Sequence, residues 1–477
     1  MKSKKFVIVL LLTAAIYVSV RVYHLGYFAL WHDEVFSVTV ASMSWHDMFR
    51  AIVADIVHPP LFYILLKCWI SIGGISVVWM RTLALLISIA TLPPLLLFCR
   101  EWCLSNGETL IAFLLVTFNE ILIHYSQELR MYSLLVGLSV LSLWLFSRWL
   151  HVGRGLLWLT AVNLLLAYTH YYGALFVFTE ALFAVWWGWK QHNRNGVVRF
   201  TSSAIVVGLL FAPWLYLVAT VARTRGLSQN LRYFVPPTIR DVIWFYAGLK
   251  GQIPVRHTAM LGLIVFLLAV AAALFAKSQP RGLTQELLLF GFFPTIVSVA
   301  VSYLTPQAIF NPRYLITVAV PCLILIAIGI MALKPLPRRT LALLVLTWSI
   351  GSGAWFTLRT DRKVPWDRLA TGLLSQPAPI YTYEPHEHAP LDFYGAANTM
   401  LPSQADIVNI PQQEFYVVYR PTTWQGPTPD VVLRSRGLSA VDRIEVHDIY
   451  ENILALRFKP GFIAQQEPTL QKDFNRQ

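Results

Sequence analysis

Apolar stretches long enough to cross a lipid bilayer recur along the first 357 residues of the chain. A helix needs roughly 20 apolar residues to cross the hydrocarbon core of a bilayer. Eleven stretches are predicted to cross it, and they lie at about 5–22, 78–99, 108–124, 132–149, 156–170, 173–189, 201–222, 257–277, 286–304, 313–332 and 338–357. A chain built in this way is predicted to be an α-helical polytopic membrane protein.

The composition excludes a soluble globular protein. Charged residues make up 13% of the chain and hydrophobic residues 56%, whereas soluble domains carry about 25% charged residues. The formal net charge is +13. In a membrane protein such an excess reflects lysine and arginine held at the cytoplasmic face. We therefore expect membrane lipids around the chain and no nucleic acid among its partners.

The positions of the basic residues predict how the chain lies in the membrane. One further apolar stretch, 60–74, is short and carries Lys67. If this stretch stays at the outer face, every basic connector between the predicted spans lies on the cytoplasmic side, as the positive-inside rule requires. The arrangement predicts a multi-pass protein of the plasma (inner) membrane with a cytoplasmic N-terminus. The first outer loop, 23–77, is then expected to hold juxtamembrane helices.

The composition changes after about residue 358, where charged residues and prolines return. We therefore predict two domains, a transmembrane domain at 1–357 and a small extracytoplasmic α/β domain at 358–477. Within the second domain, short β-branched or aromatic runs predict strands at Pro379–Tyr383, Glu414–Arg420 and Ile453–Phe458. Short helices are predicted at Leu391–Ala397 and Asp430–Leu438.

Two adjacent carboxylates, Asp33 and Glu34, follow the first predicted span. Neighbouring carboxylates at a membrane surface repel one another and are costly to desolvate. A functional interpretation makes them a catalytic base with a supporting acid. A structural interpretation makes them the start of a surface helix, where acidic side chains are favoured. The two residues alone leave both interpretations open.

Further polar residues gather in the segments predicted to lie outside. His58 precedes two prolines, and the string Ser126-Gln127-Glu128-Leu129-Arg130-Met131-Tyr132 joins two spans. His170 and Tyr171 lie at another junction, and Arg313 and Tyr314 begin a late span. A structural alternative pairs Glu128 with Arg130 and places the tyrosines in the aromatic belt. An arginine at the outer end of a span opposes the positive-inside bias, which favours a functional role for Arg313.

This combination of side chains suits a lipid-linked phosphate substrate. Arginine presents a fork of donors that matches phosphate oxygens, and a carboxylate can take a proton from an acceptor hydroxyl. The predicted reaction is a group transfer in which phosphate leaves and cations stabilise its developing charge.

At these positions the chain resembles bacterial glycosyltransferases of the GT-C fold. More narrowly, it is similar to the family 39 group, which is related to protein O-mannosyltransferases and lipid A aminoarabinose transferases. The resemblance covers about residues 5–332, and the string from Ser126 to Tyr132 is its most specific part. It implies transfer of a sugar from a polyprenyl phosphate to an acceptor hydroxyl on a protein, lipid or glycan, with inversion, on the extracytoplasmic side.

The resemblance also implies roles for individual residues. Asp33 is expected to be the base and Glu34 its partner in positioning the acceptor. The residues expected to line the site of the donor phosphate and sugar are His58, Arg130, Tyr132, His170, Tyr171, Arg313 and Tyr314. The sequence shows no convincing cluster of metal ligands, so a divalent metal is possible but not assigned.

Two other classes of protein stay open on the sequence. A transporter (flippase) of lipid-linked sugar or polysaccharide also has many spans and cationic outer pockets. Transporters commonly show two related halves with broken helices near the middle of the membrane, and no such repeat is visible here. The third class is a non-catalytic assembly subunit with an outer binding domain.

Overall fold

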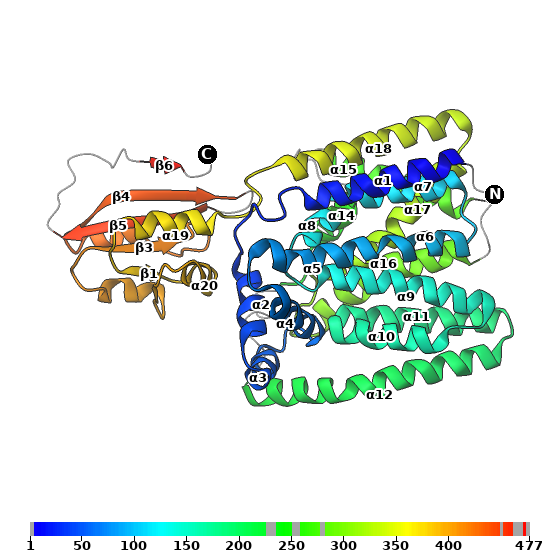
Figure 1. The fold of residues 1–477 in the computed structure, drawn as a ribbon, viewed down its shortest axis with the longest axis horizontal. Coiled ribbons are helices and arrows are strands. Elements are labelled where there is room, and N and C mark those ends of the chain that lie inside the picture. The colour runs from blue at the N-terminus through cyan, green and yellow to red at the C-terminus, as the bar shows by residue number, and fades with distance from the viewer. Residues whose placement is uncertain are drawn as a thin grey trace. The chain divides into compact units, whose positions relative to one another are not determined.

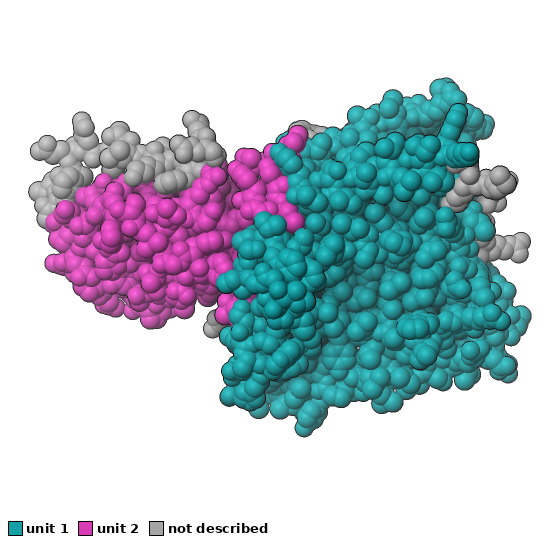
Figure 2. Space-filling model, viewed as in Figure 1, with its two compact units in different colours: residues 1–23, 40–357 teal, residues 24–39, 358–477 magenta. Residues whose placement is uncertain are grey.

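The computed structural model describes residues 4–225, 235–249, 258–276, 282–448, 452–460 and 471–473. The chain divides into two compact units (Figure 2). The first unit holds residues 1–23 and 40–357, and the second holds residues 24–39 and 358–477. Helix α2 (His32–Ser42) begins in the second unit and ends in the first.

The first unit is a bundle of helices (Figure 1). Its elements are α1 (Lys4–Val22), α3 (Trp45–Asp55), α4 (Leu61–Gly73), α5 (Val77–Ala90), α6 (Leu92–Glu101), α7 (Asn106–Phe118), α8 (Glu120–Ser126), α9 (Tyr132–Val152), α10 (Leu156–Thr169), α11 (Tyr171–Lys190), α12 (Arg194–Arg225), α14 (Ile239–Gly248), α15 (Thr258–Leu274), α16 (Leu283–Leu304), the 3-10 helix η1 (Tyr314–Val318), α17 (Ala319–Ala332) and α18 (Pro335–Leu358).

Seven helical segments in the described part of the chain are long and apolar enough to cross a membrane, and the bent pair α7–α8 makes an eighth. The predicted polytopic helical fold is therefore confirmed. Each of the eleven predicted spans falls on a helix or on two consecutive helices, although residues 257 and 277 lie outside the described residues. The predicted number of eleven crossings is not confirmed, because α10, α11 and α15 are not among these segments; α10 and the apolar part of α15 are shorter helices.

The chain bends by 57° between α7 and α8. Asn119 causes the break: its backbone is extended (φ −69°, ψ 118°), and its side-chain oxygen accepts the N–H of Leu122 at 3.0 Å. Asparagine is a favoured helix N-cap because its side chain satisfies such a backbone donor. The bend leads through α8 into the turn that carries Arg130. Gln127 in this turn donates to the carbonyl oxygens of Arg21 (3.0 Å) and Tyr23 (2.5 Å) at the end of α1.

The first outer loop contains the expected helices α2, α3 and α4. Helix α4 has 13 residues, which corresponds to a length of about 20 Å. This is shorter than the hydrocarbon core of roughly 30 Å, so α4 cannot cross alone as a straight helix. Helix α3 is amphipathic, since it buries Met48 and Ile52 and exposes Trp45 and Phe49.

Helix α17 forms the centre of the first unit. In the segment Tyr314–Ala332, 89% of the most apolar stretch of 18 residues is buried inside the bundle. Close packing against α15 depends on Gly329, because a Cβ atom there would lie 1.8 Å from the carbonyl oxygen of Ala269. The preceding turn of helix, η1, brings Tyr314 to the end of this buried helix.

The second unit contains a mixed sheet with strand order β2-β1-β3-β5-β4-β6. Its elements are α19 (Trp366–Leu374), β1 (Ile380–Thr382), α20 (Pro385–Phe393), β2 (Thr399–Met400), the 3-10 helix η2 (Gln404–Asn409), β3 (Phe415–Tyr419), α21 (Pro429–Arg434), β4 (Leu438–His447), β5 (Asn452–Pro460) and β6 (Gln471–Asp473). Strand β3 pairs in parallel with β1 and antiparallel with β5.

Both faces of this sheet are covered. Along β3 every residue is buried, and alternate side chains belong to different cores, as strand geometry requires. Tyr416 and Val418 pack in one core with α19, and Phe415 and Val417 pack in the other. The α/β class predicted for this region is therefore confirmed.

The three strands predicted for this region are confirmed as β1, β3 and β5. The two predicted helices overlap α20 and α21, but their bounds differ. The first, α20, begins earlier because Pro385 occupies its first turn, and it ends before Gly395, which has a positive φ of 83°. The second, α21, ends at Arg434, three residues before Gly437 (φ 78°) turns the chain into strand β4.

Candidate active site

Residues from four separated segments of the first unit come together in one cluster. The imidazole of His170 lies 5.2 Å from that of His58 and 4.7 Å from the ring of Tyr314, measured between centroids. The ring of Tyr132 lies 6.4 Å from both His170 and Tyr314. Arg130 contacts His58, with Nη2 3.4 Å from Nδ1, and Arg313 lies over Tyr314 at 5.5 Å. We call this set the arginine–histidine cluster: His58, Arg130, Tyr132, His170, Arg313 and Tyr314.

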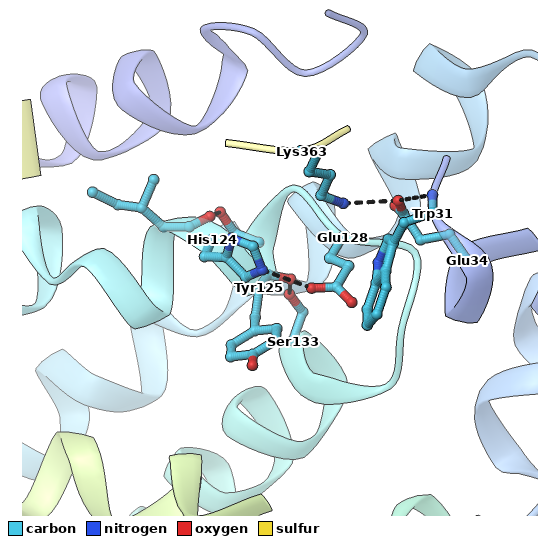
Figure 3. Close-up of polar contacts among 9 residues, drawn as sticks. Trp31, Glu34, His124, Tyr125, Glu128, Ser133 and Lys363 are labelled. Carbon is cyan, nitrogen blue, oxygen red and sulfur yellow. Dashed lines mark hydrogen bonds and ion pairs between the residues drawn. The ribbon is translucent and has the colours of Figure 1, made fainter. Parts of the chain in front are cut away.

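Each member is placed by the end of a helix. His58 and two prolines precede α4, and Arg130 lies in the turn between α8 and α9. Ser133 ties this turn together by donating to the carbonyl oxygen of Tyr125 at 2.8 Å, and His124 lies 3.0 Å from the carboxylate of Glu128 (Figure 3). Glu128 therefore contacts a histidine in the same turn.

His170 is the N-cap of α11. Its backbone is extended (φ −162°, ψ 149°), and its Nδ1 accepts the N–H of Tyr172 at 3.1 Å. An acceptor on the N-cap side chain satisfies one of the backbone donors that begin a helix. The helix start thus fixes both the direction of the imidazole and its tautomer, because Nδ1 accepts and Nε2 must carry the hydrogen in the neutral ring.

The neutral ring of His58 also carries its hydrogen on Nε2. Arginine can only donate, so Nδ1 of His58 accepts from Arg130 and Nε2 carries the hydrogen. His58 and His170 are 3% and 1% exposed, and neither Nε2 has a hydrogen-bond partner among the described residues. The cluster therefore contains two buried N–H donors whose hydrogen bonds the described protein atoms do not satisfy.

Both histidines are held in the neutral form. Burial lowers the pKa of His58 well below its ordinary value of 6.5, and the neighbouring Arg130 lowers it further. Burial, followed by Arg130 and Arg313, lowers the pKa of His170 to about 3. The positive charge of the cluster is thus carried by the two arginines, while the imidazoles add neutral donors.

The carboxylate pair belongs to the second unit and lies in the first turn of α2. Glu34 is completely buried. Its Oε2 accepts the backbone N–H of Trp31 at 3.5 Å and forms an ion pair with Lys363 at 2.8 Å (Figure 3). Asp33 is partly exposed. The location of both residues at a helix start agrees with the structural interpretation.

Tyr171, also named from the sequence, lies beside the cluster with its ring 6.5 Å from that of His170, but its hydroxyl bonds to other residues. The hydroxyl of Tyr171 donates to the carbonyl oxygen of Ile56 at 2.8 Å, and it accepts from Trp214 at 3.3 Å. Its neighbour Tyr172 instead places its ring 5.8 Å from Tyr314. Which of two adjacent tyrosines faces the cluster depends on where α11 starts, and the cap formed by His170 sets that start.

The contact of Lys363 with the carboxylate pair was also not predicted from the sequence. The available signal was the group Arg359, Arg362 and Lys363, which follows the last apolar helix directly. Basic residues at the outer end of a span oppose the positive-inside bias, and the same argument had singled out Arg313.

No group of three or more histidine, cysteine, aspartate or glutamate side chains that could hold a metal ion occurs among the described residues. His58 and His170 also fit a metal poorly, because a histidine ligand needs a free lone pair on Nδ1 or Nε2, and in both rings Nδ1 accepts a hydrogen bond while Nε2 carries the hydrogen. We therefore derive no step through a metal.

Comparison with solved structures identifies similar folds. ArnT from Cupriavidus metallidurans in the apo state has a TM-score of 0.54 and 13% sequence identity, and the match covers 94% of this chain and 97% of that one. ArnT bound to undecaprenyl phosphate has a TM-score of 0.53 and 13% identity, with 98% and 100% of the two chains covered. The oligosaccharyltransferase of Archaeoglobus fulgidus, in complex with zinc and sulfate, has a TM-score of 0.53 and 11% identity, with 86% and 67% covered.

No protein-family model matches the sequence, and no curated protein matches it. The similarity to known proteins is therefore one of fold, and it extends over nearly the whole chain of ArnT. The chain has the fold of the GT-C glycosyltransferases, as the resemblance in its sequence predicted.

Proposed function

We propose that the protein transfers a sugar from a polyprenyl-phosphate donor to an acceptor hydroxyl on the extracytoplasmic face of the plasma membrane. The observation that carries the proposal is the pair of buried N–H donors on His58 and His170 beside Arg130 and Arg313. Two cations and two neutral donors suit a phosphate group, which has several acceptor oxygens and a negative charge. The similar fold of ArnT, solved with undecaprenyl phosphate, supports the same class of donor.

In this proposal the arginine–histidine cluster holds the phosphate of the donor. The acceptor oxygen attacks the anomeric carbon and forms the new glycosidic bond. The bond between that carbon and the phosphate oxygen breaks, and polyprenyl phosphate leaves with the electron pair. Arg130 and Arg313 stabilise the charge that develops on the leaving oxygen, a contribution that preorganised groups make without reorganising during the reaction.

The proton of the acceptor hydroxyl passes to Asp33, and Glu34 positions the acceptor. A single displacement of this kind inverts the configuration at the anomeric carbon. The acceptor is a protein, a lipid or a glycan that reaches the outer face. In this proposal the N-terminus lies in the cytoplasm and the C-terminal domain outside, an orientation that the positions of the basic connectors favour.

The test uses purified protein in detergent with polyprenyl-phosphate hexose that carries a radiolabelled sugar. Release of label to water, or transfer to a crude membrane acceptor, is followed for wild type, Asp33→Asn and Asp47→Asn. Asp47 lies in the first turn of α3 in the same loop and is exposed, so its replacement is the control for a carboxylate that only favours a helix start.

Transfer by wild type and by Asp47→Asn, with its loss in Asp33→Asn, is the expected result. Equal transfer by all three proteins would remove Asp33 as the base. Tight donor binding without any transfer would favour the transporter, and movement of the donor across vesicle membranes would then be measured.

A further inference from the structure

The C-terminal domain shares its compact unit with a segment far away in the sequence. Residues 24–39, which we call the first-loop segment, belong to the same unit as residues 358–477 (magenta in Figure 2). This segment carries both Asp33 and Glu34. The domain that follows the last apolar helix is therefore folded together with the carboxylate pair.

Contacts of several kinds hold the first-loop segment against the domain. Ala29 is part of the hydrophobic core formed by α19 and one face of the sheet. The backbone N–H of Leu30 donates to the hydroxyl of Tyr394 at 2.7 Å. The guanidinium of Arg362 lies 4.4 Å from the ring centroid of Phe28, and the rings of His32 and His386 lie 4.5 Å apart. These contacts fix the backbone on which α2 begins.

The ion pair between Lys363 and Glu34 acts on the carboxylate pair itself. Its atoms are 2.8 Å apart, and the lysine and glutamate side chains are 11% and 0% exposed. A buried carboxylate stays ionised only where a cation or hydrogen bonds replace its lost hydration. Lys363 supplies that charge from a position 329 residues further along the chain.

We propose that the C-terminal domain positions the catalytic carboxylates, and that Lys363 is the positioning residue that holds the carboxylate of Glu34 in place. The inference rests on the proposed function, because it assigns a role in the same transfer reaction. Lys363 acts through Glu34 and not on the donor. Its loss is therefore expected to lower kcat and to leave the KM for the lipid-linked donor nearly unchanged.

The chain offers a matched control for this test. Arg420 and Glu387 form a second ion pair in the same domain, at 2.6 Å, with side chains 11% and 1% exposed. Arg420→Met therefore breaks a pair of nearly the same burial whose carboxylate is not part of the proposed site. It reports the effect of destabilising the domain alone.

The experiment compares full-length wild type, Lys363→Met, Lys363→Arg and Arg420→Met with radiolabelled polyprenyl-phosphate hexose. Transfer is measured over a range of donor concentrations, and the folded fraction is measured by thermal unfolding. We expect Lys363→Met to lower kcat by about 10- to 100-fold, which is less than the full contribution of a positioned base, with KM changed by no more than about twofold. Lys363→Arg is expected to restore most of the rate, because it keeps the charge.

A double substitution tests whether Lys363 works through Glu34. If it does, Glu34→Gln with Lys363→Met is no slower than Glu34→Gln alone, since the lysine then has no charge to hold. Tyr394→Phe provides a milder variant that removes only the hydroxyl bound by Leu30. We expect Tyr394→Phe to lower kcat by a few-fold with KM unchanged. If Lys363→Met folds poorly, this milder variant still tests the inference.

Three results would overturn the inference while the proposed function stands. The first is that Lys363→Met keeps the wild-type kcat although Asp33→Asn is inactive. The others are that Lys363→Met and Arg420→Met lower kcat equally, or that the decreases in kcat caused by Glu34→Gln and Lys363→Met add up in the double variant. Absence of transfer by wild type itself would contradict the proposed function and, with it, this inference.

Discussion

Nδ1 of His58 lies 3.4 Å from Nη2 of Arg130, and because arginine can only donate, the histidine is the acceptor. This one contact settles which ring nitrogen carries the hydrogen. The N–H of His58 is thereby directed away from Arg130, and its nitrogen is buried without a hydrogen-bond partner among the described residues. This arrangement supports the proposal that the arginine–histidine cluster binds the phosphate of the donor.

Replacement of either cluster arginine should reduce transfer strongly. We expect Arg130→Met and Arg313→Met each to lower the rate by about 100-fold or more, the usual cost of removing a preorganised donor from such a site. Arg130→Lys should recover only part of the rate, because an ammonium does not reproduce the arginine fork. Steady-state rates with labelled donor are the measurement. Arg50→Met, at an exposed position on α3, is the control, and equal rates in Arg130→Met and Arg50→Met would disprove the assignment.

The histidine pair predicts how stability depends on pH. The folded-state pKa of His170 is about 3 and its ordinary value is 6.5, so below pH 6.5 the unfolded chain binds more protons than the folded one. The stability contribution is therefore complete above about pH 6.5 and is lost as the pH falls toward the folded value. Thermal unfolding midpoints should decrease on acidification from about pH 7.5 to 5.

His170→Asn tests this pH dependence without removing the helix cap, since asparagine is a good N-cap residue. The variant should show a shallower fall of the unfolding midpoint with acid. His192→Asn, which makes the same change at an exposed position, is the control. Equal pH dependence in wild type and His170→Asn would show that His170 does not contribute as described.

The packing of α17 can be tested with two glycines. Gly329→Ala places a methyl group against the backbone of α15 and should destabilise the protein by about 1–3 kcal/mol, the usual cost of overpacking. Gly351→Ala in α18 meets nothing within 4 Å, and the better helix propensity of alanine should leave stability unchanged or raise it by up to about 1 kcal/mol. Unfolding midpoints in detergent distinguish the two. A reversed order would mean that α15 and α17 are not packed in this way.

The native cysteines test the predicted topology. Cys68 on α4 and Cys103 after α6 are both exposed, while Cys99 and Cys322 are buried. The topology predicts Cys68 at the outer face and Cys103 at the cytoplasmic face. A membrane-impermeant thiol reagent added outside intact cells should therefore label Cys103→Ser, which keeps Cys68, and not Cys68→Ser. Labelling of Cys68→Ser but not of Cys103→Ser would show that the orientation is inverted.

The cluster could be predicted from the sequence because its residues lie in turns between apolar helices. Polar residues are costly inside a membrane, which favours functional roles for Arg130, His170 and Arg313. Neighbouring helix ends then bring such turns together. The predicted spans fall on helices for the same reason, since a long apolar stretch in a membrane must satisfy its backbone hydrogen bonds internally.

Other features depend on contacts that no local pattern encodes. Lys363 meets Glu34 across 329 residues, and only the folded unit reveals the pair. Tyr171 and Tyr172 differ by one helical position, so the cap at His170 decides which of them faces the cluster. The bend at Asn119 and the shortness of α10 are details of packing that hydropathy alone does not encode, and the count of eleven crossings stays a prediction.

The most direct test of the account follows one oxygen atom. The donor is prepared with isotopically heavy oxygen between the sugar and the phosphate, and the products of wild-type transfer are analysed by mass spectrometry and by the configuration of the new bond. The account predicts that all the heavy oxygen leaves with polyprenyl phosphate and that the anomeric configuration is inverted. Heavy oxygen retained on the transferred sugar, or donor that crosses vesicle membranes unchanged, would contradict it.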